Sequence, residues 1–356
     1  MPQTISIENA LKLPNTIFID TRTPKEFQED HIPNAINLAI LSNDERAIVG
    51  TIYKQVSQQD AIQKGVEFFS QRLPDFLKEV TKHKDKTIII NCWRGGMRSH
   101  TVVSLLESLK FNVLQLEGGY KSYRTYIKNN LYNYQIKPKV FVLWGVTCTG
   151  KTSLLTKLHN TIDLEGLAQH RGSMYGAVGL TPSSQKSFET QLYQRLEQLN
   201  NKSYIIIEGE SHRIGDVMIP DFLWKAMNNA THILITRSIH LRAQAAIDEY
   251  FKTIPHLDEI KSITLNLPHN LLSNKRKQEI VHLLDQNNLL AAAKILLTEY
   301  YDPLYQNTLN KHTYSFEINS DDEEKAVEEI IKLTSSLRSQ THSLSQKTAT
   351  TNASHL

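Results

Sequence analysis

Residues 86–119, KTIIINCWRGGMRSHTVVSLLESLKFNVLQLEGG, decide the fold class of the first half of the chain. The apolar run before Cys92 predicts a buried strand, SHTVVSLLESLKF predicts a helix, and NVLQLEGG predicts a second strand. Strand, helix and strand in this order make up the repeating unit of a parallel sheet. TIFID (16–20) and AINLAI (35–40) are expected to be further strands of the same sheet. DAIQKGVEFFSQRLPDFLKEVTKH (60–83) has helical periodicity, which Pro74 is expected to interrupt.

A second α/β pattern begins at residue 138. PKVFVLWG (138–145), SYIIIEGES (203–211) and THILITRS (231–238) predict buried strands with helical stretches between them, and residues 256–305 are mostly helical by pattern. The tail from 336 is rich in Ser, Thr and Gln, a composition typical of disorder. The predicted organisation is a parallel-sheet domain (1–130), a connector (131–137), a second α/β domain with a helical extension (138–335) and a disordered tail (336–356).

The composition of the 356 residues, 40% hydrophobic and 22% charged, is typical of a globular protein. Two cysteines are too few for a disulfide framework, which favours a reducing compartment. The first residues show no signal-peptide pattern, and no apolar run approaches the ~20 residues that span a bilayer. We therefore expect a cytoplasmic protein without a membrane partner; the sequence does not indicate its oligomeric state.

Cys92 lies in a glycine loop between a predicted strand and a helix expected to begin near Arg98. Gly95 and Gly96 permit the backbone angles with which successive N–H groups surround an anion. Arg94, Arg98 and the helix N-terminus would add positive potential, which favours a thiolate. The pattern therefore indicates a reactive cysteine that faces an anion, in preference to an inert buried thiol.

At this point the first half resembles the rhodanese family, through the cysteine loop and through IDTRTPKEF (19–27) and HIPNAINL (31–38). The resemblance implies that the Asp-x-Arg and His-Ile-Pro segments are mainly structural and that the cysteine accepts sulfur as a persulfide. Five residues separate Cys92 from Arg98, whereas sulfur-transferring members commonly have four. This longer spacing also suits the phosphatase branch of the fold, so a persulfide carrier and a phosphatase both remain open.

The second half opens with a complete phosphate-binding loop, G-x-x-x-x-G-K-T, between a predicted strand and a helix. Its N–H groups would surround phosphates, with Lys151 on the outer phosphate and the Thr152 hydroxyl on Mg²⁺. The residues expected to bind a diphosphate are Gly145, Thr149, Gly150, Lys151 and Thr152. Cys148, inside this loop, is interpreted as a small residue without a redox role; exchange of a chalcogen with Cys92 is the alternative.

The strand YIIIEGES ends in Glu208 and Glu210, with Gly209 where such domains usually have an aspartate. The missing aspartate weakens the prediction of an ordinary ATPase, because ATP hydrolysis normally uses that acid. A site that holds a diphosphate without hydrolysing ATP remains allowed. Glu208 is the candidate Mg²⁺ ligand, with Glu210 beside it.

The two loops together resemble the bacterial tRNA 2-selenouridine synthase family over roughly residues 10–310. The stretches that carry the resemblance are VGTIYKQVS (49–57), NCWRGGMRS (91–99), LEGGYKSYR (116–124), DLEGLAQHRGSMYG (163–176), EGESHRIG (208–215) and YYDPLY (300–305). The resemblance implies action on a tRNA whose wobble uridine is 2-thiolated. It also implies transfer of a geranyl group from geranyl diphosphate to that sulfur, and replacement of the sulfur by selenium from selenophosphate. A selenophosphate-producing enzyme would then be a partner, and no tightly bound cofactor is expected apart from Mg²⁺.

Further contacts are expected around these loops. His170, Arg171 and Arg213 are candidates for phosphate or tRNA contacts. Between Thr81 and Lys139 the chain has 11 Lys and Arg against 3 Asp and Glu, which fits a polyanionic partner or, alternatively, an ordinary solvated basic face. The candidate tRNA contacts on the helix after residue 118 are Lys121, Arg124 and Lys128, interleaved with tyrosines that would stack on bases or pack the helix.

Two other functions remain compatible with the loops taken separately. One is a rhodanese-type sulfurtransferase or Cys-x5-Arg phosphatase with a nucleotide-binding regulatory domain. The other is a small-molecule kinase that uses loop 145–152, with the first domain as a binding module.

Overall fold

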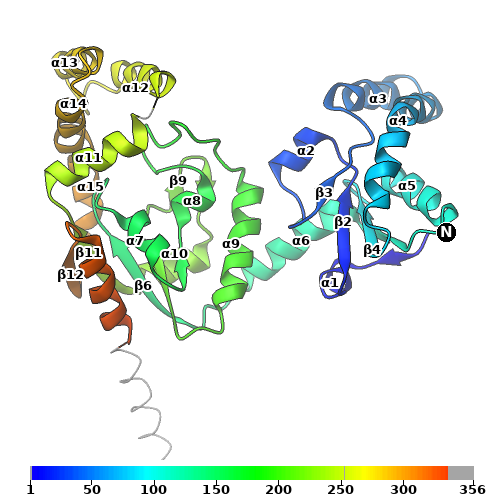
Figure 1. Ribbon diagram of the computed structural model, residues 1–356, viewed down its shortest axis with the longest axis horizontal. Helices are drawn as coiled ribbons and strands as arrows, with labels where there is room; N and C mark the ends of the chain where they lie inside the picture. Colours follow the sequence, from blue (N-terminus) through cyan, green and yellow to red (C-terminus); the bar gives the residue numbers. More distant parts are fainter. Residues whose placement is uncertain (1, 252, 336–356) are drawn as a thin grey trace, which may run out of the picture. The chain divides into compact units, whose positions relative to one another are not determined.

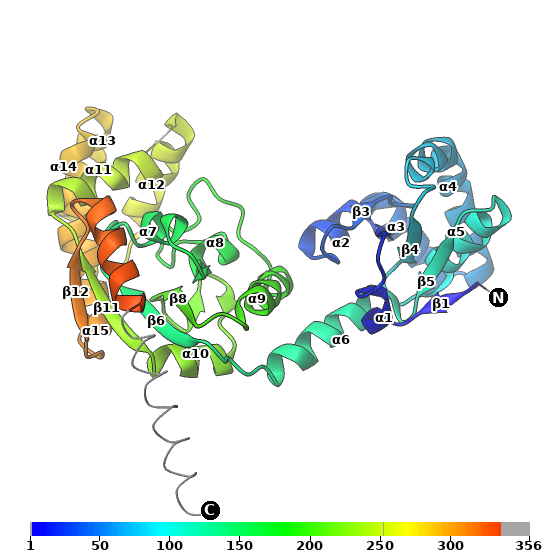
Figure 2. The same ribbon diagram turned by 60° about the horizontal axis from the view of Figure 1, so that its bottom comes forward.

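A computed structural model describes residues 2–251 and 253–335. The chain divides into two compact units (Figures 1 and 2), and its first division follows Asn133, inside the segment that we predicted as a connector. The first unit also includes Ser184–Tyr193, and the second takes the rest of the chain after Asn133. The predicted disordered tail, 336–356, lies outside the described residues.

The first unit is built on a five-stranded sheet in the order β1-β5-β4-β2-β3, and every pair of neighbouring strands is parallel. Its elements, in chain order, are β1 (Thr4–Ile5), α1 (Ile7–Ala10), β2 (Thr16–Asp20), α2 (Pro24–Glu29), β3 (Ile36–Asn37), α3 (Asn43–Gln55), α4 (Gln58–Thr81), β4 (Thr87–Asn91), α5 (Met97–Ser108), β5 (Val113–Leu116) and α6 (Gly119–Tyr132). The predicted parallel α/β architecture is confirmed. The strand predicted at 35–40 is reduced to two residues at the sheet edge.

Two helices of this unit differ from the prediction. The expected break at Pro74 is wrong, since α4 runs through it without interruption. Phe69, Phe76 and Val80 are buried on both sides of the proline, so core packing compensates for the lost backbone hydrogen bond. Helix α3 was not predicted, although Ser42 and Glu45 form a capping box at its start. The two helices pack side by side (Figure 1).

The second unit contains a five-stranded parallel sheet in the order β12-β11-β6-β8-β7, and a separate antiparallel hairpin of β9 and β10. Its elements are β6 (Lys139–Trp144), α7 (Lys151–Lys157), β7 (Thr161–Ile162), α8 (Leu164–Ala168), α9 (Gln185–Leu199), β8 (Tyr204–Glu208), β9 (Arg213–Ile214), β10 (Val217–Met218), α10 (Asp221–Asn228), β11 (Thr231–Thr236), α11 (Ile239–Tyr250), α12 (Ile254–Asn266), α13 (Asn274–Asp285), α14 (Leu289–Ile295), the π-helix η1 (Leu296–Tyr301), α15 (Asp302–Leu309) and β12 (Phe316–Asn319). The first part of α9 belongs to the first unit.

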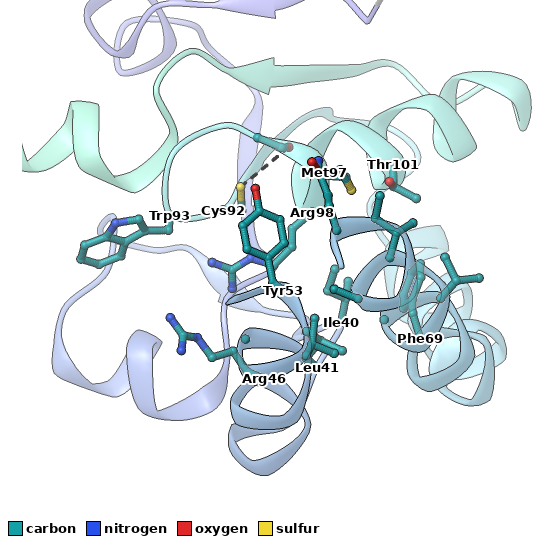
Figure 3. A pocket seen from close by; sticks show the side chains of 18 of the residues that line it. Ile40, Leu41, Arg46, Tyr53, Phe69, Cys92, Trp93, Met97, Arg98 and Thr101 are labelled. Atoms are coloured by element: carbon teal, nitrogen blue, oxygen red, sulfur yellow. Dashed lines mark hydrogen bonds between the residues drawn. The ribbon is translucent and has the colours of Figure 1, made fainter. Parts of the chain in front are cut away.

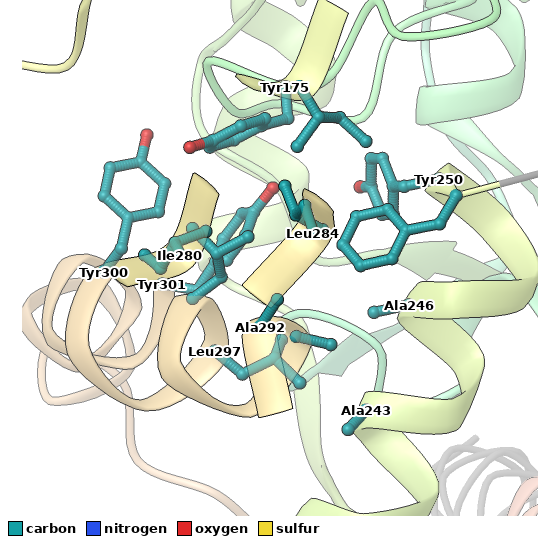
Figure 4. Close-up of a cluster of buried hydrophobic side chains, with 14 of the residues drawn as sticks. Tyr175, Ala243, Ala246, Tyr250, Ile280, Leu284, Ala292, Leu297, Tyr300 and Tyr301 are labelled. Carbon is teal, nitrogen blue, oxygen red and sulfur yellow. The ribbon is translucent and has the colours of Figure 1, made fainter. Parts of the chain in front are cut away.

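The predicted helical region after residue 256 is confirmed, and it has its own core (Figure 4). Ala243 and Ala246 give α11 a small-residue face on which α14 packs closely. Tyr175, Tyr250 and Tyr301 are buried in the same core. Within the described residues, no helix combines the length and the apolar composition that a membrane crossing requires.

Candidate active sites

Cys92 directly follows β4, at the carboxyl end of the first sheet, and only 3% of it is exposed. Its Sγ lies 3.2 Å from Oγ of Ser99, on the first turn of α5. Gln115 of β5 donates one hydrogen bond to Ser99 Oγ (3.0 Å) and another to the Gly95 carbonyl (2.6 Å). Gln115, on the strand next to β4, therefore holds the cysteine loop in place through these two hydrogen bonds. Ser99 and Gln115 were not predicted as site residues; the signal for Gln115 in the sequence is an amide within the apolar strand VLQL.

The two loop glycines have different roles. Gly95 has φ +63°, and a Cβ there would lie 2.8 Å from the Leu116 carbonyl oxygen, so this position requires glycine. Gly96 has open space around its Cα and is the N-cap of α5, which begins at Met97, slightly earlier than predicted. The backbone conformation of the loop thus depends on Gly95, whereas the space beside Gly96 is free of other atoms.

The two loop arginines also differ. Arg94 is exposed, whereas Arg98 is half-buried and its Nη1 lies 3.1 Å from Oε2 of Glu26. Burial alone would raise the pKa of Glu26, but Arg98 and the Thr23 N–H hold it below its usual value. Arg98 is already paired with Glu26, so it can bind an anion at Cys92 only if the anion joins this ion pair or replaces Glu26 in it. Arg94 is exposed and can bind an anion directly.

Cys92 opens onto a groove of about 1080 Å³ between its loop and the α3–α4 helix pair (Figure 3). We call this space the Cys92 groove. Its apolar lining includes Ile40, Leu41, Ile62, Val66, Phe69 and Met97. Its charged lining is cationic, with Arg46, Lys54, Arg94 and Arg98, and no Asp or Glu lines it among the described residues. Such a groove favours a ligand with an apolar part and a negative part.

The Asp-x-Arg segment is structural in this chain. Asp20 and Arg22 form a fully buried ion pair, with Nη2 2.6 Å from Oδ2. The Arg22 guanidinium also stacks over the Tyr120 ring at 3.7 Å. These contacts connect the end of β2 to α6, and Arg22 is fully buried, so it has no access to a ligand.

The predicted tRNA contacts on α6 separate into two kinds. Lys121 and Lys128 are exposed. Arg124 is 7% exposed, pairs with Asp30 and Glu189, and donates to Thr190 Oγ1 at 3.0 Å. Its guanidinium would have to leave these partners to reach a phosphate. The tyrosines interleaved with these residues mainly pack the helix: Tyr120 and Tyr123 are buried and Tyr126 is half-buried.

The phosphate loop connects β6 to α7, as its motif requires. Gly150 has φ +84° and is the N-cap of α7, and a Cβ on Gly145 would lie 2.6 Å from Thr149 Oγ1. Lys151 is buried, and its Nζ donates to the Gly145 carbonyl at 3.1 Å across the loop. All five predicted loop residues therefore lie together around the start of one helix, where N–H groups favour phosphate.

Behind the loop, three carboxylates from different parts of the chain converge. Glu165 of α8, Glu208 at the end of β8 and Glu210 each offer an oxygen within 4.8 Å of the others. Thr152 Oγ1 donates to Glu208 Oε1 at 3.2 Å, and Glu210 Oε1 is buried without a hydrogen-bond partner. We call Glu165, Glu208 and Glu210 the acidic cluster. Its oxygens, with the Thr152 hydroxyl, are the hard ligands that suit Mg²⁺.

The electrostatics of the acidic cluster fit a cation. Burial raises the pKa of Glu210 to about 7, and burial together with neighbouring carboxylates raises the pKa of Glu165 and Glu208 well above the usual value. Burial alone would lower the pKa of Lys151, but the three glutamates raise it. Unless a metal ion binds, the Lys151 ammonium faces three carboxyl groups.

Glu165 was not predicted as a site residue, because nothing in DLEGLAQ indicates that its side chain faces β8.

Gly209 has a steric explanation. A Cβ at this position would lie 2.5 Å from the Trp144 ring and 2.8 Å from the Leu143 carbonyl oxygen. Glycine at the place of the usual aspartate therefore lets the chain after β8 pass close to β6. Glu208 and Glu210, on either side of Gly209, and Glu165 provide the carboxylates at this site in place of the usual aspartate.

The phosphate loop opens onto a pocket of about 420 Å³ whose lining includes Lys151, Glu165, Glu208, Arg171 and Arg237. Arg171 is held there by Glu249, 2.6 Å away, and by the Val178 carbonyl. Arg237, which the sequence analysis missed, follows β11, the neighbour of β6 in the sheet. The signal in the sequence that could have identified Arg237 is its position directly after a predicted strand.

His170 and Arg213 are not among the residues that line this pocket. Burial lowers the pKa of His170, and its Nδ1 accepts a hydrogen bond from the Gly172 N–H at 3.1 Å, so at neutral pH it is not a cation. Arg213 is exposed and pairs with Asp216. Of the three outer candidates, only Arg171 lies at the pocket.

Cys148 has φ +63° within the phosphate loop, and burial raises its pKa to about 12. A thiol with that pKa stays protonated at physiological pH and is a weak nucleophile. This agrees with the interpretation of Cys148 as a small loop residue without a redox role.

These features define a class of protein: a rhodanese-like cysteine domain joined in one chain to an α/β domain with a phosphate loop. Residues 6–126 match the rhodanese-like domain family, and residues 138–263 match the family described as the tRNA 2-selenouridine synthase AAA domain. The chain belongs to the tRNA 2-selenouridine synthase family.

Relatives in several bacteria carry that family's name. The tRNA 2-selenouridine synthase of Proteus mirabilis is 33% identical over 347 residues, covering 87% of this chain and 94% of the relative. That of Nitrosomonas europaea is 34% identical and covers 69% of this chain and 66% of the relative. Among solved structures, the N-terminal domain of a Clostridium difficile 630 protein is 49% identical, covering 35% of this chain and 98% of that one, with a TM-score of 0.35.

Proposed function

We propose that this chain modifies a 2-thiolated wobble uridine in tRNA in two steps: geranylation of the sulfur, then replacement of the geranylated sulfur by selenium. Family membership supports tRNA selenouridine modification as the overall function. The observation that carries the two-step proposal is the presence, in one chain, of a complete phosphate loop with an acidic cluster and of a cysteine loop with a large groove.

In the first step, the thiocarbonyl sulfur attacks C1 of geranyl diphosphate, the allylic C–O bond breaks, and diphosphate leaves. Negative charge grows on the diphosphate as that bond breaks. Lys151, Arg171 and Arg237 line the pocket in which we place it. A preorganised donor of this kind typically contributes ~3 kcal/mol to transition-state stabilisation. Mg²⁺ held by Thr152 and the acidic cluster would add positive charge against the same group.

Alkylation makes the second step feasible, because a thiocarbonyl sulfur is a poor leaving group and an alkylated sulfur leaves as a thiol. We place the second step at Cys92, whose loop would hold selenophosphate. Its selenium, already at the selenide level, attacks C2 of the base, the C–S bond breaks and the geranyl thiol leaves with a proton; water then cleaves the P–Se bond and releases phosphate and the 2-selenouridine. Arg94 is exposed on the loop and can bind the phosphate of that donor directly, whereas Arg98 would have to share or release Glu26. A selenophosphate-producing enzyme would supply the donor.

The tRNA needs a cationic surface near the cysteine loop. Lys121 and Lys128 are exposed on α6, and Arg94 is exposed on the loop itself. These side chains are suited to phosphate contacts, which position the RNA without reading its sequence. Arg124 is suited instead to holding residues 184–190 in place within the first unit.

The test is an in vitro reaction of the purified chain with 2-thiolated tRNA, geranyl diphosphate and selenophosphate, followed by mass spectrometry of the nucleosides. Cys92→Ser should still form the S-geranyl nucleoside but no selenouridine. Lys151→Ala should lower S-geranyl formation about a hundredfold, from the ~3 kcal/mol above, yet still selenate tRNA supplied already geranylated. Lys157→Ala, on the same helix but outside the pocket lining, is the matched control.

Loss of both activities in both variants would remove the division of labour between the two loops. Activity on thiosulfate and cyanide, or on a phosphoester, in the absence of tRNA would favour the sulfurtransferase or phosphatase alternative. Phosphorylation of a small molecule by ATP that survives Cys92→Ser would favour the kinase.

A further inference from the structure

The Cys92 groove is much larger than an anion needs. Its volume of about 1080 Å³ lies slightly above the ~300–1,000 Å³ usual for small-molecule sites, whereas the cysteine loop alone could hold a phosphate-sized group. The groove extends away from Cys92 along the α3–α4 helix pair. A function for the loop alone therefore leaves most of this space unexplained.

The wall of the groove is unusually apolar for an exposed surface. Tyr53 is 57% exposed, Val66 is 56% exposed and Met97 is 48% exposed, and all three line it. Clustered exposed apolar side chains of this kind usually mark a binding surface. Gly50 and Gly65 add to the lining from the two helices, where the lack of a side chain widens the space.

The groove is also polarised along its length. Figure 3 shows Arg46 and Trp93 on one side of Cys92, and Phe69 and Thr101 on the other. The cationic and aromatic side suits a nucleoside with its flanking phosphates, since arginine binds phosphate and indole stacks on bases. The opposite side suits a hydrocarbon. Cys92 lies between the two.

We infer that the Cys92 groove binds the allylic chain of the S-geranylated wobble uridine during the selenium step. The inference rests on the proposed function, in which the sulfur at C2 of the base carries that chain while selenophosphate held at Cys92 delivers selenium to C2. The first carbon of the chain is therefore two bonds from the reacting carbon, through the sulfur, and must lie near Cys92.

The available space supports this occupant. At roughly 30 Å³ per carbon, about the share of one liquid water, a geranyl chain takes on the order of 300 Å³. The groove accommodates it with room for the base. The apolar space beside Cys148, near the phosphate loop, encloses about 20 Å³ and is too small. Binding the chain at Cys92 would also hold the leaving thiol in an apolar environment, away from the nucleophile.

The test measures binding, separately from catalysis. The probes are the nucleoside S-geranyl-2-thiouridine and, as reference, S-methyl-2-thiouridine, titrated into the full chain by calorimetry. Burial of only two methylene groups corresponds to about tenfold in Kd, so the geranyl nucleoside should bind at least about tenfold more tightly. Val66→Asn, which places an amide in the groove wall, should reduce that preference about fourfold, the equivalent of one methylene. Val56→Asn is the matched control, because Val56 is an exposed valine at the end of α3 outside the lining.

A second measurement locates the chain directly. A geranyl nucleoside with a diazirine at the far end of the chain should label residues of α3 and α4 on irradiation, as mapped by peptide mass spectrometry. Equal affinity for the geranyl and methyl nucleosides, equal effects of the two valine variants, or labelling confined to the second unit would each overturn the inference. Failure of the proposed function would appear differently, as absence of S-geranyl and selenouridine nucleosides from the tRNA reaction.

Discussion

Gly95 and Gly96 are adjacent in the cysteine loop, yet replacing each with alanine should have very different effects. At Gly95, φ +63° places an alanine in the left-handed region, which costs ~1–2 kcal/mol. The new Cβ would lie 2.8 Å from the Leu116 carbonyl oxygen and 3.0 Å from the Gly118 nitrogen, and overpacking of this kind costs ~1–3 kcal/mol. Lower entropy of the unfolded chain returns ~0.4–1 kcal/mol. Gly95→Ala should therefore destabilise the first unit by roughly 2–4 kcal/mol.

At Gly96, φ is −93° and nothing lies within 4 Å of an added Cβ. Glycine is modestly preferred to alanine at an N-cap, so the substitution costs a little stability in the folded state. Alanine also lowers the conformational entropy of the unfolded chain, which offsets this cost. The free energy of unfolding should change by less than ~1 kcal/mol.

The assay is amide hydrogen exchange followed by mass spectrometry on peptides that cover β4, the buried strand before the loop. A loss of 2–4 kcal/mol should accelerate exchange there by about 30-fold to 1000-fold. Peptides from β6 and β8 in the second unit should exchange at the wild-type rate in both variants. Equal acceleration by Gly95→Ala and Gly96→Ala would refute the claim that the backbone conformation at Gly95 holds the loop.

Three further outcomes are expected. In a Cys92→Ser background, alkylation of Cys148 at pH 8 should be roughly a thousandfold slower than that of a free thiol, since its pKa is about 12; a rate within tenfold would contradict the raised pKa. The pKa of Glu210, about 7 in the folded state, lies above its unfolded value, so the folded protein retains a proton that the unfolded chain releases. The metal-free protein should therefore lose stability as pH rises from about 5 through 7, and a melting series should show Glu210→Gln flattening that loss. Arg124→Met leaves the buried Asp30 and the half-buried Glu189 without their guanidinium partner and should destabilise the first unit by ~3–5 kcal/mol in urea, whereas Lys121→Met on the exposed face of α6 should be neutral within ~0.5 kcal/mol.

Much of the fold could be read from local patterns. Apolar runs such as TIIIN and KVFVLW bury both faces of a strand, and helical periodicity between them implies parallel sheets. The phosphate loop was also readable, because its residues are contiguous and its chemistry uses backbone N–H groups at a helix start. Helix α3 was missed although the Ser42–Glu45 capping box was visible, and the break expected at Pro74 does not occur because packing on both sides stabilises the helix.

The sequence by itself determined two parallel-sheet domains, a cysteine loop and a phosphate loop, since each depends on residues close together in the chain. Only the tertiary structure brought Glu165 to Glu208 and Glu210, fixed Arg124 between Asp30 and Glu189, and formed the Cys92 groove from α3, α4 and the loop. The physical reason is that ion pairing, metal ligation and apolar lining depend on distances between side chains. Local patterns specify which face of a helix or strand is buried, but the packing of whole elements decides which distant side chains meet there.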